Sequence, residues 1–322
     1  MLEGLSDASS LSVAPKPLQG GADYIVSLRA ALDAAGHGDV KISLPDSGLD
    51  PEIVTLLATN ASFSASVAVV GLHSDPDSEP VIEATGHRYW RSETGFAPIS
   101  LSSDWEGAQG WGSQLSRTYI AANVTASISW STIWSVLPGL PYDGRGIMMA
   151  NTPWSGNYAV SAPVWVSAHY GQFADPGWRY LLTGSGSGLL PTSTTATPDG
   201  GSFVTLVPPG DLSGVTLVVE TMGLPAQPGL EFQLAGGLPG PGTLLHVWAT
   251  TDASRFVPLG DLVVSPNGTF TVDVPADAIV TVSTVATASH GQPSSPIPPP
   301  APLVLPYSDD FSEASYPYDS CE

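Results

Sequence analysis

The chain has 322 residues, of which 9 are Lys or Arg and 30 are Asp or Glu, so its formal net charge is −21. This acidic balance excludes a nucleic-acid partner, because phosphate binding needs a basic surface. A hydrophobic fraction of 42% is too high for a disordered acidic chain. No apolar run reaches the roughly 18 residues that a membrane-spanning helix needs, so we expect no transmembrane segment and a turn-rich globular protein.

Residues 1–22 form a Ser-, Gly- and Pro-rich coil in this interpretation, and from residue 23 onward helices and strands are expected to alternate. Ile25, Leu28 and Leu32 recur at helical spacing, so they predict a helix that ends at Gly36. The next predicted elements are a strand at 40–44, a helix capped by Asp50, strands at 67–72 and 89–92, a long helix from 114 to just before Pro138, and a strand at 164–168. This alternation is typical of a parallel α/β sheet.

Helical periodicity disappears after about residue 183. Short β-rich runs separated by turn residues replace it, at 203–207, 216–220, 245–250, 262–264, 269–274 and 279–284. Such spacing indicates an antiparallel β-sandwich over 183–292. Seven prolines within 293–306 then predict a stiff extended spacer.

The cysteine and the histidines of the sequence form no recognisable metal-binding motif. Cys321 is the only cysteine, so there is neither a disulfide framework nor a cysteine-based zinc site. The six histidines have no metal-binding spacing, and we expect no metal and no cofactor. Glycosylation sequons at Asn60, Asn123 and Asn267 give weak support for a secreted glycoprotein, although residues 1–21 lack the pattern of a signal peptide.

Tryptophan and one glutamate are the side chains best suited to sugar chemistry. Eight of the nine tryptophans lie between Trp90 and Trp178; indole is a flat platform for a sugar ring, but any single tryptophan is more often a core anchor. Glu93 ends a predicted strand, where barrel enzymes place catalytic groups; the alternative is a surface glutamate that begins a loop. His73 and His169 follow predicted strands, so each either points into a site or is a satisfied buried imidazole.

Several motifs in residues 88–181 resemble the galactocerebrosidase family, glycoside hydrolase family 59. They are YWRSE at 89–93, LPY at 140–142, PWSG at 153–156, PVWVSAH at 163–169, QF at 172–173 and PGW at 176–178. Weaker similarity covers roughly 23–290, and DDF at 309–311 resembles the start of the lectin-like domain of that family.

This resemblance implies a retaining β-galactosidase that hydrolyses galactosylceramide and related sphingolipids. Glu93 would be the nucleophile, Trp130 a pocket tryptophan, and His73 and Trp154 further substrate-binding residues. Members of the family work in lysosomes with a saposin-like, lipid-presenting partner, so the resemblance implies a lysosomal or secretory location.

The departures from the family pattern concern the acid/base and half of the fold. The family's acid/base belongs to an Asn-Glu dipeptide on the fourth barrel strand, and this chain has none; residues 223–242 also lack an arginine that the family uses for substrate contact. The expected fold is therefore the C-terminal half of a (β/α)8 TIM barrel, strands five to eight, over 23–182. The sandwich at 183–292 follows, and 293–322 hold the linker and a truncated start of the lectin-like domain.

We therefore expect a fragment of a longer protein or an incomplete gene model that is inactive on its own. Two alternatives stay open. One is a non-catalytic glycan- or lipid-binding β-protein derived from the same family. The other is that a local carboxylate such as Asp46 replaces the missing acid. Asp46 follows the strand predicted at 40–44, and that strand is expected to end at the same active site as the strand before Glu93.

Overall fold

The computed structural model describes residues 19–73, 82, 84–94, 104–135, 144–190 and 200–308. The motifs at 140–142 and 309–311 and the first 18 residues of the coil expected at 1–22 lie outside these ranges. Residues 19–22 are not coil, because they form the first turn of a helix that begins at Gln19. The chain forms two compact units: unit 1 is Met1–Thr94 with Thr118–Ile128, and unit 2 is Gly95–Arg117 with Ser129–Glu322.

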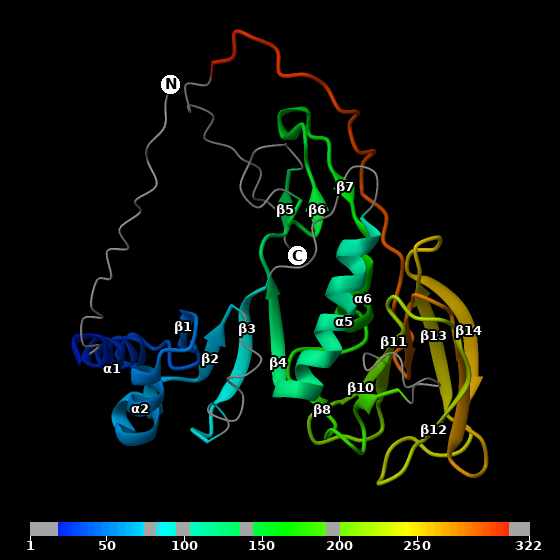
Figure 1. The fold of residues 1–322 in the computed structure, drawn as a ribbon, viewed down its shortest axis with the longest axis horizontal. Coiled ribbons are helices and arrows are strands. Elements are labelled where there is room, and N and C mark those ends of the chain that lie inside the picture. Colours follow the sequence, from blue (N-terminus) through cyan, green and yellow to red (C-terminus); the bar gives the residue numbers. More distant parts are fainter. Residues whose placement is uncertain are drawn as a thin grey trace, which may run out of the picture. The chain divides into compact units, whose positions relative to one another are not determined.

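Unit 1 is built around a four-stranded sheet in the order β1-β2-β3-β4 (Figure 1). Its elements, in chain order, are α1 (Gln19–Ala34), β1 (Ser43–Ser47), α2 (Pro51–Thr59), α3 (Ala61–Ser66), β2 (Val69–Leu72), β3 (Arg88–Thr94), the end of α5 (Trp105–Ala122) and β4 (Val124–Ser129). Strand β2 pairs in parallel with β1 on one side and with β3 on the other. The first two predicted helices and the first three predicted strands are thus present, with β1 three residues later than expected.

Local sequence explains the helix starts and the core of unit 1. The side chain of Asp50 caps α2 by accepting a hydrogen bond from the backbone N–H of Glu52 at 2.8 Å, and Pro51 occupies the first turn, as the sequence predicts. Val70 and Leu72 on β2 are fully buried. They pack in one cluster with Ile53 and other side chains of the helices, so burial of β2 holds these helices against the sheet.

Two predicted elements are wrong. Residues 164–168 are not a strand, because they lie in helix α6 (Ala162–Gly171), which has Ser161 at its N-cap and a proline in its first turn. The long helix α5 begins at Trp105 and ends at Ala122, where Asn123 takes a left-handed φ of 47°. Residues 124–129 then form strand β4, so the fourth strand of the sheet comes from a segment predicted to be helical.

Unit 2 contains the predicted antiparallel sheets. A seven-stranded sheet has the order β14-β13-β16-β11-β10-β8, with β9 paired to β10, and β12 pairs with β15 in a second sheet. The strands are β8 (Arg179–Tyr180), β9 (Gly188–Leu189), β10 (Ser202–Val207), β11 (Thr216–Glu220), β12 (Gln227–Gln233), β13 (Leu244–Thr250), β14 (Val257–Val263), β15 (Thr269–Val274) and β16 (Ile279–Ser283). Side chains of both sheets share one apolar core. Strands β8, β9 and β12 were not predicted.

The remaining part of unit 2 includes helix α6, the first part of α5 and a small sheet, β5 (Ile133–Trp134), β6 (Met148–Met149) and β7 (Ala159–Val160). The proline-rich segment follows as an extended trace, orange to red in Figure 1. It contacts the short 3-10 helix η2 (Pro153–Ser155): the indole N–H of Trp154 donates to the carbonyl of Ala301 at 2.7 Å, and the Asn157 amide donates to that of Pro298 at 2.7 Å. Among the described residues, no helix is long and apolar enough to cross a bilayer.

Candidate active site

Three acid–base side chains meet where β1, β2 and β3 end. Glu93 is the penultimate residue of β3, His73 directly follows β2, and Asp46 is the penultimate residue of β1. The Nε2 atom of His73 lies 3.4 Å from Oδ1 of Asp46 and 3.5 Å from Oε2 of Glu93. Because neighbouring parallel strands end at the same edge of a sheet, this is the edge at which α/β enzymes assemble catalytic groups.

The cluster is open to a ligand. The exposed side-chain fractions are 39% for His73, 37% for Glu93 and 63% for Asp46. The Nε2 atom of His73 is nevertheless buried and forms no hydrogen bond with described residues. Its distances to the two carboxylates are ion-pair distances that exceed a well-formed N–H···O bond. The site therefore combines accessible carboxylates with one buried ring nitrogen between them.

A bulge explains why Asp46 faces this cluster. Pro45 pairs with Gly71 and Ser47 pairs with Leu72, so Asp46 is an extra residue in the ladder between β1 and β2. Its φ of 62° is left-handed, a conformation that Asp tolerates better than most residues because of its short polar side chain. Bulges redirect side chains at sheet ends, and this one directs the Asp46 carboxylate to His73.

Gly71 sets the close spacing of the strands beneath the cluster. A Cβ atom at Gly71 would lie 2.5 Å from Oγ of Ser43 on β1 and 2.9 Å from Cβ of Ser92 on β3. Only a hydrogen fits in that space. Ser92 itself has a buried Oγ with no partner among the described residues.

The structure gives the aromatic candidates different surroundings. Trp130 directly follows β4 instead of lying within a helix, and its ring centroid is 5.3 Å from that of Trp134. Trp154 is 49% exposed, with its N–H already bonded to the proline-rich segment. Both residues belong to unit 2, whereas the cluster around His73 belongs to unit 1.

His169 is a structural residue. It is fully buried on α6, and its ring nitrogens bond to the hydroxyls of Thr281 and Thr250 at 2.8 and 2.9 Å. Burial lowers its pKa to about 3, so it is neutral at physiological pH. Of the two alternatives for His169, the buried imidazole with both nitrogens hydrogen-bonded is therefore the correct one.

Glu93 and His73 were predicted as site residues from the sequence, whereas Asp46 was considered only as an alternative acid. The strand predicted at 40–44 ends before Asp46, whereas the observed β1 contains it. The signal available in the sequence was Pro45-Asp46 after an apolar run, a pairing typical of a strand that ends in an irregular turn.

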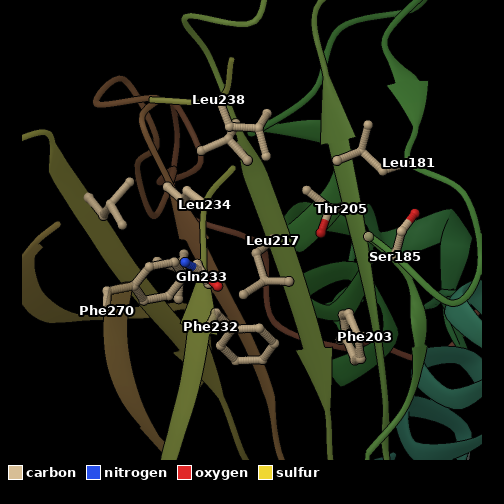
Figure 2. Close-up of a pocket in the computed structure, with 14 residues that line it drawn as sticks. Leu181, Ser185, Phe203, Thr205, Leu217, Phe232, Gln233, Leu234, Leu238 and Phe270 are labelled. Carbon is tan, nitrogen blue, oxygen red and sulfur yellow. The ribbon is translucent and has the colours of Figure 1, made fainter. Parts of the chain in front are cut away.

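A hollow in the β-sandwich differs in character from the cluster around His73. It measures about 60 Å³ and is lined largely by Leu, Val and Phe side chains; Figure 2 shows Phe203, Phe232 and Leu217 around it. No carboxylate is among the described side chains that line it, so it does not compete with the edge of the unit 1 sheet as a site for acid–base chemistry.

Comparison with known proteins connects this edge to a family. Residues 17–172 match the model of glycosyl hydrolase family 59, and this range contains Asp46, His73 and Glu93. Over this range the chain is similar to family 59.

The chain is 35% identical to the galactocerebrosidases of Macaca mulatta and of Homo sapiens, over 326 and 325 residues. Each alignment covers 93% of this chain and 44% of the relative, so the chain spans less than half the length of these relatives.

Solved structures agree on the type of fold. The family 30 subfamily 8 xylanase Xyn30A from Clostridium acetobutylicum has a TM-score of 0.58 and 15% identity, over 83% of this chain and 60% of that one. SrfJ from Salmonella typhimurium has a TM-score of 0.55 and 12% identity, over 81% of this chain and 51% of that one. At such low identity the likeness concerns the fold, which is an α/β sheet region followed by antiparallel sheets.

Proposed function

We propose that this chain carries the nucleophile half of a retaining β-galactosidase active site, with galactosylceramide and related sphingolipids as substrates. The observation that supports it best is the position of Glu93: it is the penultimate residue of β3, inside the region that matches family 59, and it lies beside His73. The relatives named galactocerebrosidase supply the substrate class.

The proposed reaction follows from two carboxyl groups about 5 Å apart. An oxygen of Glu93 attacks the anomeric carbon of galactose, and the bond from that carbon to the ceramide oxygen breaks. The ceramide oxygen takes its proton from the second carboxyl group. Water then hydrolyses the galactosyl ester and regenerates the Glu93 carboxylate.

The second carboxyl group has two candidates. The resemblance assigns it to an Asn-Glu dipeptide that this sequence does not contain. Asp46 is the local alternative: because both carboxylates contact the same nitrogen, its Oδ1 lies no more than about 6.9 Å from Oε2 of Glu93, against the roughly 5 Å typical of retaining enzymes. We favour the dipeptide, because Asp46 is already held toward His73.

In the same proposal, the four-stranded sheet is half of a (β/α)8 barrel, and strands from outside this sequence complete it. The supporting observations are the parallel pairing of β1, β2 and β3 and the share of the relatives that the chain spans. The resemblance assigns to Trp130 the stacking on galactose and to Trp154 and His73 further contacts with the sugar, and of these three residues His73 is the one in the same unit as Glu93.

We further propose a lysosomal or secretory location with a saposin-like protein that presents the lipid. The net charge of −21 supports it, since self-repulsion among carboxylates weakens as they are protonated in an acidic compartment.

A fluorosugar with an activated leaving group tests the proposal on this chain. Dinitrophenolate leaves without a proton, so 2,4-dinitrophenyl 2-deoxy-2-fluoro-β-galactoside reacts with a nucleophile even where the acid is missing. We expect one galactosyl group per chain, no label in Glu93→Gln, and unchanged labelling in Glu231→Gln, which alters an exposed carboxylate of unit 2. Equal labelling of Glu93→Gln, or none of the parent chain, would contradict the proposal. Glycan binding without labelling would favour the non-catalytic alternative.

A further inference from the structure

The Nε2 atom of His73 lies almost midway between two carboxylates. Its separations from Asp46 and Glu93 differ by only 0.1 Å, and both are longer than a well-formed hydrogen bond. One N–H cannot bond fully to two acceptors on different strands.

We propose that His73 is a positioning residue whose Nε2–H group is shared between Glu93 and Asp46, and that Asp46 influences the reaction through His73 without touching the sugar. The inference rests on the proposed role of Glu93 as nucleophile. It assigns to Asp46 a role other than that of a replacement acid.

The charge of Glu93 changes during the proposed reaction. The free Glu93 carboxylate is a strong acceptor, so the N–H of His73 orients it. Once Glu93 has formed the galactosyl ester, it has lost its charge and accepts a hydrogen bond only weakly. Asp46 is still a carboxylate, and the N–H turns to it. At 3.4 and 3.5 Å the buried nitrogen has no full hydrogen bond, and closing on Glu93 in the free state or on Asp46 in the ester would remove the penalty of an unpaired buried donor.

The backbone supports this division of roles. The bulge and the left-handed φ of 62° take Asp46 out of the ladder between β1 and β2, and non-glycine residues keep such a conformation only when the surrounding structure holds them in it. The irregularity therefore delivers a carboxylate to His73 at 3.4 Å. A regular ladder residue would leave the nitrogen with Glu93 alone.

The first test does not depend on catalysis. In the ¹⁵N-labelled chain, we expect the Nε2 signal of His73 to move in both Asp46→Asn and Glu93→Gln, because each variant removes one of its two charged neighbours. His87, which bonds to Thr85 and to the carbonyl of Ser64, is the internal reference and should not move. A His73 signal that responds to only one of the variants would overturn the sharing, whatever the fate of the proposed function.

The second test is a double-mutant cycle on fluorosugar labelling, in which the leaving group needs no acid. We expect His73→Ala to slow labelling at least tenfold and His73→Gln, which keeps an N–H donor, to recover part of the rate. Asp46→Asn should slow labelling severalfold when His73 is present and less than twofold in the His73→Ala background. Exposed Asp39→Asn is the matched control.

The outcomes separate the two proposals. Equal effects of Asp46→Asn in both backgrounds would mean that Asp46 acts directly, which overturns the inference but not the role of Glu93. If every His73 variant were labelled at Glu93 at the rate of the parent chain, the positioning role of His73 would be overturned as well. No labelling of the parent chain would contradict the proposed function, and the nitrogen signal of His73 would still decide whether the donor is shared.

Discussion

The carboxylate of Glu93 and the Nε2 atom of His73 lie 3.5 Å apart at the ends of two neighbouring parallel strands. This separation depends on how closely β2 and β3 approach each other just before the site. Gly71 allows that approach, since a side chain there would collide with Ser43 and Ser92.

Gly71→Ala should therefore destabilise unit 1 and disturb the site together. Overpacking of this kind costs about 1–3 kcal/mol, and denaturant unfolding measures it. Gly48→Ala is the matched control, because Gly48 is exposed, a Cβ atom there would meet no other atom within 4 Å, and its φ is not positive; it should change stability by less than about 0.5 kcal/mol. If Gly71→Ala were as harmless as Gly48→Ala, the spacing of β2 and β3 would not depend on this glycine.

The sequence allowed the first three strands of unit 1 and most strands of the sandwich to be predicted, because their apolar runs are bounded by clear turn and cap residues. Strand β4 was missed because Ile120, Val124 and Ile128 are spaced four apart, which fits a helix. The decisive signal was Asn123: Asn is one of the few residues that take a left-handed conformation after a helix. The short apolar run at 164–168 has no periodicity that separates a strand from a buried helix, and it is helical.

The candidate site was predictable only in part. Glu93 and His73 follow strands whose positions are clear from their apolar runs. The contact with Asp46 depends on a three-residue shift of β1 and a bulge at Asp46, which neither hydrophobic pattern nor spacing encodes.

Glu220 is a buried charge that should stabilise unit 2. It is 1% exposed, and its carboxylate accepts bonds from Arg117 at 3.0 Å, Ser202 at 2.6 Å and the backbone N–H of Met222 at 3.0 Å. Glu220→Gln removes the charge that compensates Arg117, so we expect a loss of about 3 kcal/mol in the free energy of unfolding. Exposed Glu231→Gln should cost little. Equal stability of the two variants would show that the pair contributes nothing.

His169 should make the fold sensitive to acid. Its folded pKa of about 3 lies below the roughly 6.5 of an unfolded histidine, so below pH 6.5 the unfolded chain binds a proton that the folded chain does not. Stability is therefore lost as pH falls from about 6.5 toward 3. Between about pH 6 and pH 4.5, the parent chain should lose about 2 kcal/mol more than His169→Gln.

The control is exposed His37→Gln, which should keep the parent's pH slope in denaturant unfolding. If His169→Gln kept the same slope, burial of this imidazole would not be the source of the acid sensitivity.

Trp154 should hold the proline-rich segment in place. Trp154→Phe keeps an aromatic ring but removes the donor to Ala301, a hydrogen bond that contributes about 1 kcal/mol. We expect proteinase K to cut near residues 298–305 several times faster in this variant. Trp178→Phe is the control and should be cut at the parent rate; equal cleavage of Trp154→Phe would mean that other contacts hold the segment.

The most direct measurement of the central claim is the position of the fluorogalactosyl ester. Digestion of the labelled chain and fragment sequencing by mass spectrometry identify the modified residue. We expect a single modified residue, Glu93, in the peptide that contains YWRSE at 89–93. A label on Asp46, or on any carboxylate outside the ends of β1, β2 and β3, would contradict it.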